Sequence, residues 1–435
     1  MIPREGTNLD PWYGLYADRT AGLSASEVRA LFAVASRPEV VSLAGGMPFV
    51  SALPLESIRS SMERVMRDQG ARALQYGSGQ GTPELREHIL EIMALEGVRA
   101  GVDDVVVTTG SQQALDLIAK LFLDSGDVVL AESPSYVGAM GIFRSYQAEV
   151  SHIAMDADGM IPAALVERIA SLRAAGRSIK FLYLIPNFHN PAGVTLSWER
   201  RLEIIEIARR EGVLIVEDNP YGLLWFDRPA PHAMRSVETD GIVYLGSFSK
   251  TLAPGFRIGW ALAPHAIREK LVLAAESAIL SPSAVNELVV SDYLANADWK
   301  GQIDTFRGLY RERRDALIDA LEHYLPDLEW TNPNGGFYVW VTLPEGLDAK
   351  AMLPRAVKEL VAYTPGTAFF ADGSGRANLR LSYCYPMPTE IREGIRRLAS
   401  VVRGEQELLS TFHPTGPVEL VLPEPHVISP PPNLG

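Results

Sequence analysis

The sequence predicts an α/β protein in which a large domain with a mostly parallel sheet is followed by a smaller α+β domain. Short runs of Val, Ile and Leu alternate with helical patterns between residues 105 and 264, and such runs are typical of parallel strands covered on both faces. A long amphipathic helical pattern over 303–321 then precedes two strand patterns at 336–341 and 377–383. The change of pattern after residue 300 indicates the second domain.

The individual elements follow in chain order. Ser24 and Glu27 form a capping box ahead of helically spaced apolar residues, which predicts a short helix starting near Ser26. The strand runs of the first region are 105–108, 128–130, 181–185, 213–216, 242–245 and 258–262. After Arg403 the chain is rich in proline and has no periodicity, so we expect an extended or mobile tail there.

Length and composition bound the function. A chain of 435 residues suits about two domains, and we expect an N-terminal arm and helix over 1–47, a large domain over 48–300, a small domain over 301–403 and the tail over 404–435. The net charge of -13 without a basic stripe argues against nucleic-acid binding. No run is apolar enough to cross a membrane and no leader pattern opens the chain, so a cytoplasmic location is expected by default.

Cysteine usage restricts the chemistry further. Cys384 is the only cysteine, which excludes an internal disulfide and a thiolate metal cage. We expect no metal site, and Cys384 is most simply a buried small residue.

Polar residues follow the predicted strands, where ligands of open α/β sheets bind. Gly110, Ser111 and Gln112 open a helix after the first strand, and free amides there stabilise an anion, although Ser111 taken alone is more often only a helix cap. Tyr136 follows the second strand, and by itself it fits simple packing. Asn190 follows the third strand within a turn-rich segment.

The last two strand ends carry charged side chains. Asp218 ends an apolar run, where a carboxylate is costly unless it meets a cation. Lys250 lies between Ser247 and Arg257 on a glycine-rich loop, and such a lysine taken alone is more often solvated. One ligand accounts for all these residues. Pyridoxal phosphate needs a lysine for a Schiff base, an acid for its ring nitrogen, donors for its phosphate and a stacking aromatic ring.

With these residues in place, the chain resembles a fold-type I aminotransferase of class I/II. It is most similar to the branch that contains kynurenine/2-aminoadipate aminotransferases and the catalytic domains of MocR-type regulators. The motifs that carry the resemblance are LAGGMP at 43–48, YGSGQG at 76–81, PNFHNPAG at 186–193, SFSK at 247–250 and LRLS at 379–382. They occur in the family's order, and the match spans roughly residues 24–403. The resemblance implies a mostly parallel seven-stranded sheet between helices, pyridoxal 5'-phosphate as cofactor and a homodimer.

The resemblance also implies a role for each matching residue around the cofactor. Lys250 would form the Schiff base and then move the proton between the substrate's Cα and the cofactor. Asp218 would pair with the ring nitrogen, Tyr136 would stack on the ring, and Tyr221 and Asn190 would bind its hydroxyl. Ser111, Gln112, Ser247 and Arg257 would hold the phosphate, and Tyr76 would reach the phosphate in the neighbouring subunit.

The substrate-binding residues follow in the same way. Arg380 would clamp the substrate's α-carboxylate with Asn190 nearby, although Asn378, Arg380 and Ser382 on one strand face also fit a solvated polar face. Gly46 would let the backbone approach the substrate. Arg29 would contact a distal carboxylate, which suggests glutamate and 2-oxoglutarate as one substrate pair, while an arginine on a short helix also fits a solvated position.

Three function classes fit this sequence. The leading prediction is transamination between an L-amino acid and a 2-oxo acid. The same cofactor also supports elimination, decarboxylation or cyclisation, and the sequence leaves these open. A non-catalytic regulator is disfavoured because the family pattern begins within about 25 residues of Met1, where relatives of that type carry a DNA-binding domain. Phe188 and His189 differ from the small or polar residues common at these positions in the family, so the identity of the second substrate stays open.

Overall fold

The structure is a computed structural model that describes residues 9–23 and 37–412. Within these residues the main sheet has eight strands in the order β2-β9-β8-β7-β6-β3-β4-β5. They are β2 (Val105–Thr108), β3 (Val128–Ser133), β4 (Glu149–Asp156), β5 (Gly159–Met160), β6 (Ile179–Leu184), β7 (Leu214–Asp218), β8 (Ile242–Ser247) and β9 (Gly259–Leu262). The five strands from β8 to β4 run parallel, and β9 and β5 are antiparallel to their neighbours. The predicted α/β class with a mostly parallel sheet is confirmed.

Two strands of this sheet differ from the sequence prediction. The eighth strand, β5, is a two-residue strand at the edge beside β4. The strand runs read from the sequence did not include β4, because its sequence EVSHIAMD mixes polar with apolar residues and only Ser151 and Ile153 are buried. A strand with so few buried residues lacks the continuous apolar run that marked the central strands.

Helices cover both faces of the main sheet because successive side chains of each strand point to opposite faces. Val128 and Leu130 pack in one apolar cluster with α6 (Pro162–Ala174) and α7 (Trp198–Glu211). Val129 and Ala131 belong to a second cluster, with α4 (Ser111–Phe122) and α5 (Val137–Ser145). Of the remaining helices in this part of the chain, α3 (Pro83–Ala94) and α8 (His265–Ile279) contact β2, and α2 (Leu55–Ala73) packs on α9 (Ala284–Asn296).

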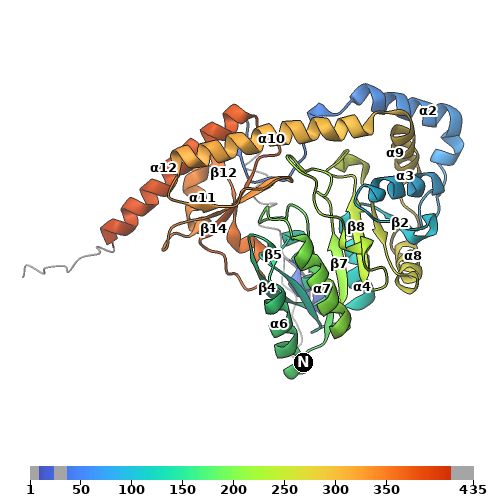
Figure 1. The fold of residues 1–435 in the computed structure, drawn as a ribbon, viewed down its shortest axis with the longest axis horizontal. Helices are drawn as coiled ribbons and strands as arrows, with labels where there is room; N and C mark the ends of the chain where they lie inside the picture. Colours follow the sequence, from blue (N-terminus) through green and yellow to red (C-terminus); the bar gives the residue numbers. More distant parts are fainter. Residues whose placement is uncertain (1–8, 24–36, 413–435) are drawn as a thin grey trace, which may run out of the picture.

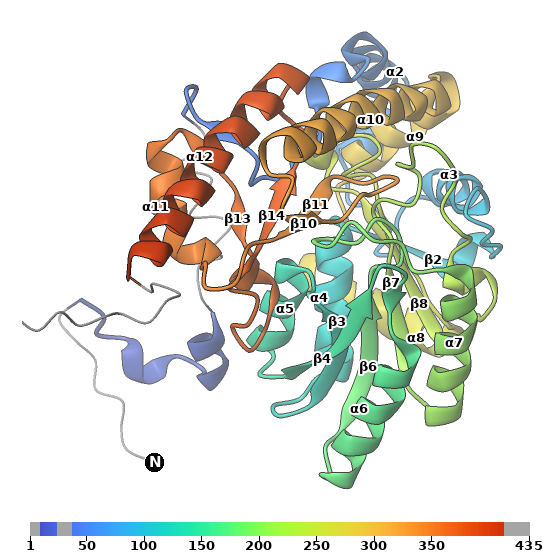
Figure 2. The ribbon, with the colours of Figure 1, turned by 60° about the vertical axis from the view of Figure 1, so that its left-hand side comes forward.

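A second, smaller sheet with its own helices is formed by later parts of the chain. Its antiparallel sheet has the order β10-β11-β14-β13, formed by Glu329–Trp330, Tyr338–Thr342, Asn378–Ser382 and Thr364–Pro365. The helices α10 (Trp299–Tyr324), α11 (Ala349–Lys358) and α12 (Pro388–Phe412) accompany it. Figures 1 and 2 show α10 running from the α2 and α9 end of the molecule to lie beside α12. The chain also returns here near its start, because β1 (Val41–Ser42) pairs in parallel with β12 (Val361–Ala362).

The end of α12 corrects one expectation. The helix continues to Phe412, so residues 404–412 are helical and not part of an extended tail. Leu398, Val402 and the half-buried Leu409 join the core at helical spacing, which the proline-rich composition beyond them concealed. The Ser24 capping box, its helix and the rest of the tail lie outside the described residues, and the domain boundaries stay predictions. In the part of the chain that the structure describes, no helix could cross a membrane.

Candidate active site

A cavity of about 610 Å³ lies at the carboxyl ends of the parallel strands, where the two sheets meet. Its lining includes Tyr136 after β3, Asn190 after β6, Asp218 at the end of β7, Lys250 after β8 and Arg380 on β14. These five side chains are far apart in sequence. The parallel topology brings the ends of β3, β6, β7 and β8 to one edge of the main sheet, and Arg380 comes from the smaller antiparallel sheet. A concave site with a few convergent polar groups is the usual form of a small-molecule site.

Lys250 lines the cavity. Its Nζ atom donates to the carbonyl oxygen of Gly46 at 3.0 Å and lies 5.7 Å from the ring centre of Phe337. Burial lowers the pKa of this lysine, and the cations Arg380 and Arg257 act in the same direction against an opposing effect of Cys384. A depressed pKa gives the amine a larger neutral fraction, as a nucleophile or base requires.

Asp218 offers one free carboxylate oxygen to the cavity. The Tyr183 hydroxyl donates to Oδ2 at 2.8 Å, whereas the buried Oδ1 has no partner among the described residues. Burial raises the pKa of Asp218 to about 6, and the bond from Tyr183 opposes this shift. A buried carboxylate with one unsatisfied oxygen is costly on its own. Its chemistry fits a ligand that presents a protonated ring nitrogen, as pyridoxal phosphate does.

Four predicted phosphate-binding residues gather beside the N-terminus of α4. The Nη2 atom of Arg257 donates to the Thr109 carbonyl at 3.2 Å, and a β-carbon on Gly110 would lie 2.5 Å from the same atom. Gly110 has φ +80°, so glycine is required here for both reasons. The Ser249 amide donates to Ser247 Oγ at 3.0 Å. Of the four residues, Gln112 lines the cavity, while Ser111, Ser247 and Arg257 lie next to that lining.

Gly259 allows β9 to pack closely against the start of α4. A β-carbon on it would lie 2.4 Å from the Ser111 amide nitrogen. The backbone of β9 therefore packs directly on the first turn of α4, where amides without a helical partner stabilise anions. The contact brings Ser111 and the segment that carries Arg257 to one place.

Arg380 is buried between two aromatic rings. Its Cζ atom lies 4.2 Å from the ring centre of Tyr338 and 4.9 Å from that of Phe369. Its Nη1 donates to Asn190 Oδ1 at 2.8 Å and its Nη2 to the Ala44 carbonyl at 2.6 Å. Its Nε is buried without a partner among the described residues. The side chain is 3% exposed, so the alternative of a solvated polar face on β14 is wrong.

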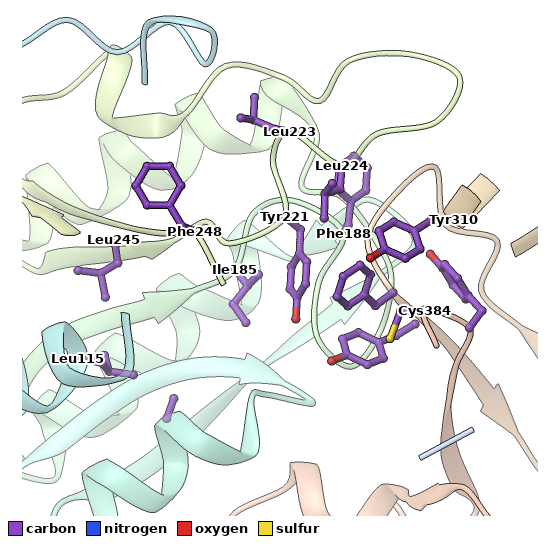
Figure 3. Packing of buried hydrophobic residues seen from close by; sticks show 14 of the residues in the cluster. Leu115, Ile185, Phe188, Tyr221, Leu223, Leu224, Leu245, Phe248, Tyr310 and Cys384 are labelled. Carbon is purple, nitrogen blue, oxygen red and sulfur yellow. The ribbon is translucent and has the colours of Figure 1, made fainter. Parts of the chain in front are cut away.

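The two cavity tyrosines are fixed by different contacts. The Tyr136 hydroxyl donates to Gln112 Oε1 at 3.2 Å, and burial raises the pKa of Tyr136 to about 12. Tyr221 packs edge-on against Phe337 and Tyr338 at 5.4 and 6.1 Å between ring centres, and burial raises its pKa as well. Figure 3 shows the Tyr221 ring between Ile185 and the group of side chains that includes Phe188 and Tyr310. Both tyrosines are therefore protonated at neutral pH.

Comparison with known proteins agrees with this geometry. The family model described as "Aminotransferase class I and II" matches residues 38–398. This chain belongs to that family. It is 40% identical to aromatic-amino-acid aminotransferase 1 of Thermococcus litoralis over 90% of this chain and 95% of that protein. Class I and II aminotransferases depend on pyridoxal phosphate, and so does this enzyme.

Solved structures of the family confirm the fold-type I architecture. Pyrococcus horikoshii kynurenine aminotransferase, in complex with PMP, is similar with a TM-score of 0.86 and 37% identity, covering 90% of this chain and 97% of that one. The alpha-aminoadipate aminotransferase of Thermus thermophilus, complexed with N-(5'-phosphopyridoxyl)-L-leucine, has a TM-score of 0.84 and 34% identity. The shared region covers 91% of this chain and 99% of that one.

Tyr76 and Arg29, both named from the sequence, are not among the described lining residues of this aminotransferase's cavity, for different reasons. Tyr76 is 79% exposed and does not line the site. Arg29 lies outside the described residues. Gly46, in contrast, lies on the cavity wall, where a β-carbon would come 1.9 Å from the Tyr338 hydroxyl oxygen. Glycine at position 46 is required by this close approach.

The unusual pair Phe188 and His189 lies away from the cavity lining of the aminotransferase. Phe188 is 1% exposed and packs against Gly335 and Gly336. His189 Nδ1 accepts the Ala192 amide at 3.2 Å, which leaves the proton on Nε2, 3.0 Å from a buried carboxylate oxygen of Glu132. Neither side chain lines the cavity, although both directly precede Asn190, which does.

Sequence reasoning missed three contributors to the site. Tyr183 and Tyr338 lie within strands β6 and β11, where an aromatic residue looks like ordinary core. Phe369 comes from a short helix between β13 and β14.

Cys384 is buried and free as predicted. Its Sγ donates to the Met47 carbonyl at 3.0 Å, next to Gly46, whose carbonyl accepts the hydrogen bond from Lys250.

Proposed function

We propose that this aminotransferase moves the amino group between an L-amino acid and a 2-oxo acid, with glutamate and 2-oxoglutarate as one pair. The observation that carries this proposal is the convergence of Lys250, Asp218 and Arg380 on one cavity. Lys250 suits an aldehyde that reacts with an amine, Asp218 suits a cationic ring and Arg380 suits a carboxylate. Relatives that act on aromatic amino acids and on 2-aminoadipate support a substrate with a side chain of substantial length.

Lys250 is proposed as the catalytic amine and base. Bound pyridoxal phosphate supplies an aldehyde carbon and an electron-withdrawing ring. The lowered pKa of Lys250 leaves its amine able to react with the aldehyde. The same Nζ atom would be the base that takes the proton from the substrate's Cα.

Asp218 is proposed to hold the proton on the ring nitrogen of the cofactor. The bond from Tyr183 fixes Oδ2 and leaves Oδ1 as the acceptor. A cation beside Asp218 would lower the pKa of its carboxyl and so oppose the effect of burial. Tyr136 is proposed to stack on the ring, and Tyr221 and Asn190 to bind its hydroxyl.

The phosphate and the substrate's carboxylate are proposed to bind at separate corners. Ser111, Gln112, Ser247 and Arg257 surround the amide-rich first turn of α4, which favours the phosphate. Arg380 offers a planar fork to the α-carboxylate, and its packing between Tyr338 and Phe369 holds that fork in one plane. Asn190 bonds to Arg380 and so links the carboxylate corner to the cofactor's hydroxyl.

The active form is proposed to be a homodimer to which each subunit contributes Tyr76. The Gly77 amide donates to Ser281 Oγ at 3.3 Å, which places the segment of Tyr76 beside the end of α8. Leu74, Tyr76, Ile279 and Leu280 are all exposed there. Exposed apolar side chains on neighbouring segments support a protein interface at this place.

The central proposal is tested by locating the cofactor. Borohydride treatment of the reconstituted enzyme followed by peptide mass mapping should place a pyridoxyl group on Lys250. Lys250→Ala should carry no such group and lose nearly all turnover, while Lys270→Ala, at an exposed position on α8, should behave like wild type. An adduct on another lysine would overturn the assignment. Conversion of the bound cofactor to its amine form by L-glutamate tests the proposed pair.

A further inference from the structure

One cation on the cavity wall has no role in the machinery described above. Arg144 lines the cavity from the last turn of α5. No hydrogen bond or ion pair of its guanidinium occurs within the described residues, in contrast to Arg380, whose Nη atoms bond to Asn190 and the Ala44 carbonyl. Asp218 is the only carboxylate among the described lining residues, and its Oδ2 already accepts a hydrogen bond from Tyr183. The wall near Arg144 therefore carries a positive charge that no lining carboxylate neutralises.

The helix α5 sets where this charge lies relative to the reaction centre. Tyr136 is the residue before the helix, and the helix has nine residues, so it is about 13 Å long. Arg144 is therefore far beyond the ring that Tyr136 is proposed to cover. With the α-carboxylate at Arg380 and the Cα near Lys250, the wall formed by α5 and by Gly22 and Leu23 is left for the substrate's side chain.

The cavity wall between Arg144 and the reaction centre at Lys250 has free space beside it. A β-carbon on Gly141 would meet no atom within 4 Å, so this lining position leaves free space. A β-carbon on Gly22, another lining residue, would lie 2.8 Å from the Arg144 carbonyl oxygen and 3.3 Å from its Cγ. The segment at Gly22 thus packs on the backbone and the first carbons of Arg144, and this contact orders the stem of the side chain next to the cavity.

We infer that Arg144 binds the distal carboxylate of a dicarboxylic substrate whose side chain passes over Gly141. The inference rests on the proposed function, because it places the α-carboxylate at Arg380 and the reacting carbon at Lys250. The substrate class is an amino acid, or its 2-oxo acid, with a carboxylate at the end of an extended side chain. Arg144 is a second cation for this group in addition to the one predicted at position 29.

Equilibrium binding of unreactive acids tests the inference without turnover. Glutarate carries two carboxylates, whereas butyrate carries one. By isothermal titration calorimetry of the holoenzyme, Arg144→Gln should weaken glutarate about ten-fold or more, the size expected for a lost charge-assisted hydrogen bond, and should change butyrate much less. Glutamine keeps the Cβ and Cγ that pack near Gly22. Arg99→Gln is the control, since Arg99 is exposed and outside the site.

A second variant tests the path of the side chain. Gly141→Leu should lower kcat/KM for glutamate about ten-fold relative to alanine, because the new side chain enters the open space, while helix propensity rises. Unchanged glutarate affinity in Arg144→Gln, or an equal loss for butyrate, would overturn the inference. Equal losses for glutamate and alanine in Gly141→Leu would overturn the path. If wild-type enzyme transfers no amino group from any donor, the proposed function itself fails.

Discussion

Arg380 on β14 and Asn190 after β6 join the two sheets, with Nη1 donating to Oδ1 at 2.8 Å. The pair places the proposed carboxylate fork against the loop that follows a central strand of the main sheet. Because the fork is planar and packed between two rings, lysine cannot replace it. We expect Arg380→Lys to lower kcat/KM about 100-fold for every amino donor, as for the loss of a bidentate charged pair.

Steady-state kinetics with several donors measure this effect. Arg376→Lys is the matched control, because Arg376 is exposed just before the same strand. A decrease confined to dicarboxylic donors would contradict the role of Arg380 in binding the α-carboxylate.

Asp218 should limit the stability of the apoenzyme. Burial raises its pKa to about 6 from 3.8, so the folded state binds a proton more tightly than the unfolded state. The contribution of Asp218 to stability is then greatest below its unfolded pKa of 3.8 and is lost as pH rises through about 6. A shift of about two units corresponds to roughly 3 kcal/mol at neutral pH.

Asp218→Asn should therefore raise the melting temperature of the apoenzyme at pH 7, and the gain should shrink toward pH 4. The amide keeps an acceptor for Tyr183, and the same variant should lose most activity because it cannot hold the ring proton. Asp327→Asn, at an exposed position, serves as the control for removing a charge. A lower melting temperature for Asp218→Asn at pH 7 would contradict the burial argument.

The sequence predicts the main sheet well because its central strands are continuous apolar runs that need no knowledge of distant contacts. It also predicts Lys250, Asp218 and Asn190, since each follows a strand whose end must face the same edge. Tyr183 and Tyr338 could not be predicted in this way. Their role depends on which side chain lies across the cavity, and an aromatic residue inside an apolar strand gives no sign of it.

The same reasoning explains the errors at the edges of the fold. The strand β4 is half exposed, so its sequence lacks the apolar run of a buried strand. Residues 404–412 remain helical because Leu409 still reaches the core, and this long-range contact is not evident from composition. Arg144 was missed because an arginine late in a helix resembles a solvated residue.

The sequence prediction for Arg29 can be tested although this residue lies outside the described residues. Arg29→Ala should raise the KM for dicarboxylic substrates more than the KM for monocarboxylic ones, because a distal carboxylate would lose a charged partner. Arg37→Ala is a nearby control at an exposed position. Kinetics with glutamate and alanine as donors measure the difference, and equal changes for both would remove Arg29 from the site.

The proposed contribution of Tyr76 to the partner's site predicts complementation between two defective subunits. Tyr76 is 79% exposed and does not line the cavity of its own chain. Tyr76→Phe homodimers should bind the cofactor about ten-fold more weakly, because the phosphate loses one hydrogen bond. Consider a heterodimer of one Tyr76→Phe subunit and one Lys250→Ala subunit. Lys250 is then present only in the Tyr76→Phe subunit. The phosphate of the cofactor bound there would contact the intact Tyr76 of the other subunit. That single site should show wild-type cofactor affinity and roughly half the turnover of a symmetric dimer. Cofactor titration of the purified heterodimer measures both, and an affinity equal to that of the Tyr76→Phe homodimer would place Tyr76 outside the partner's site.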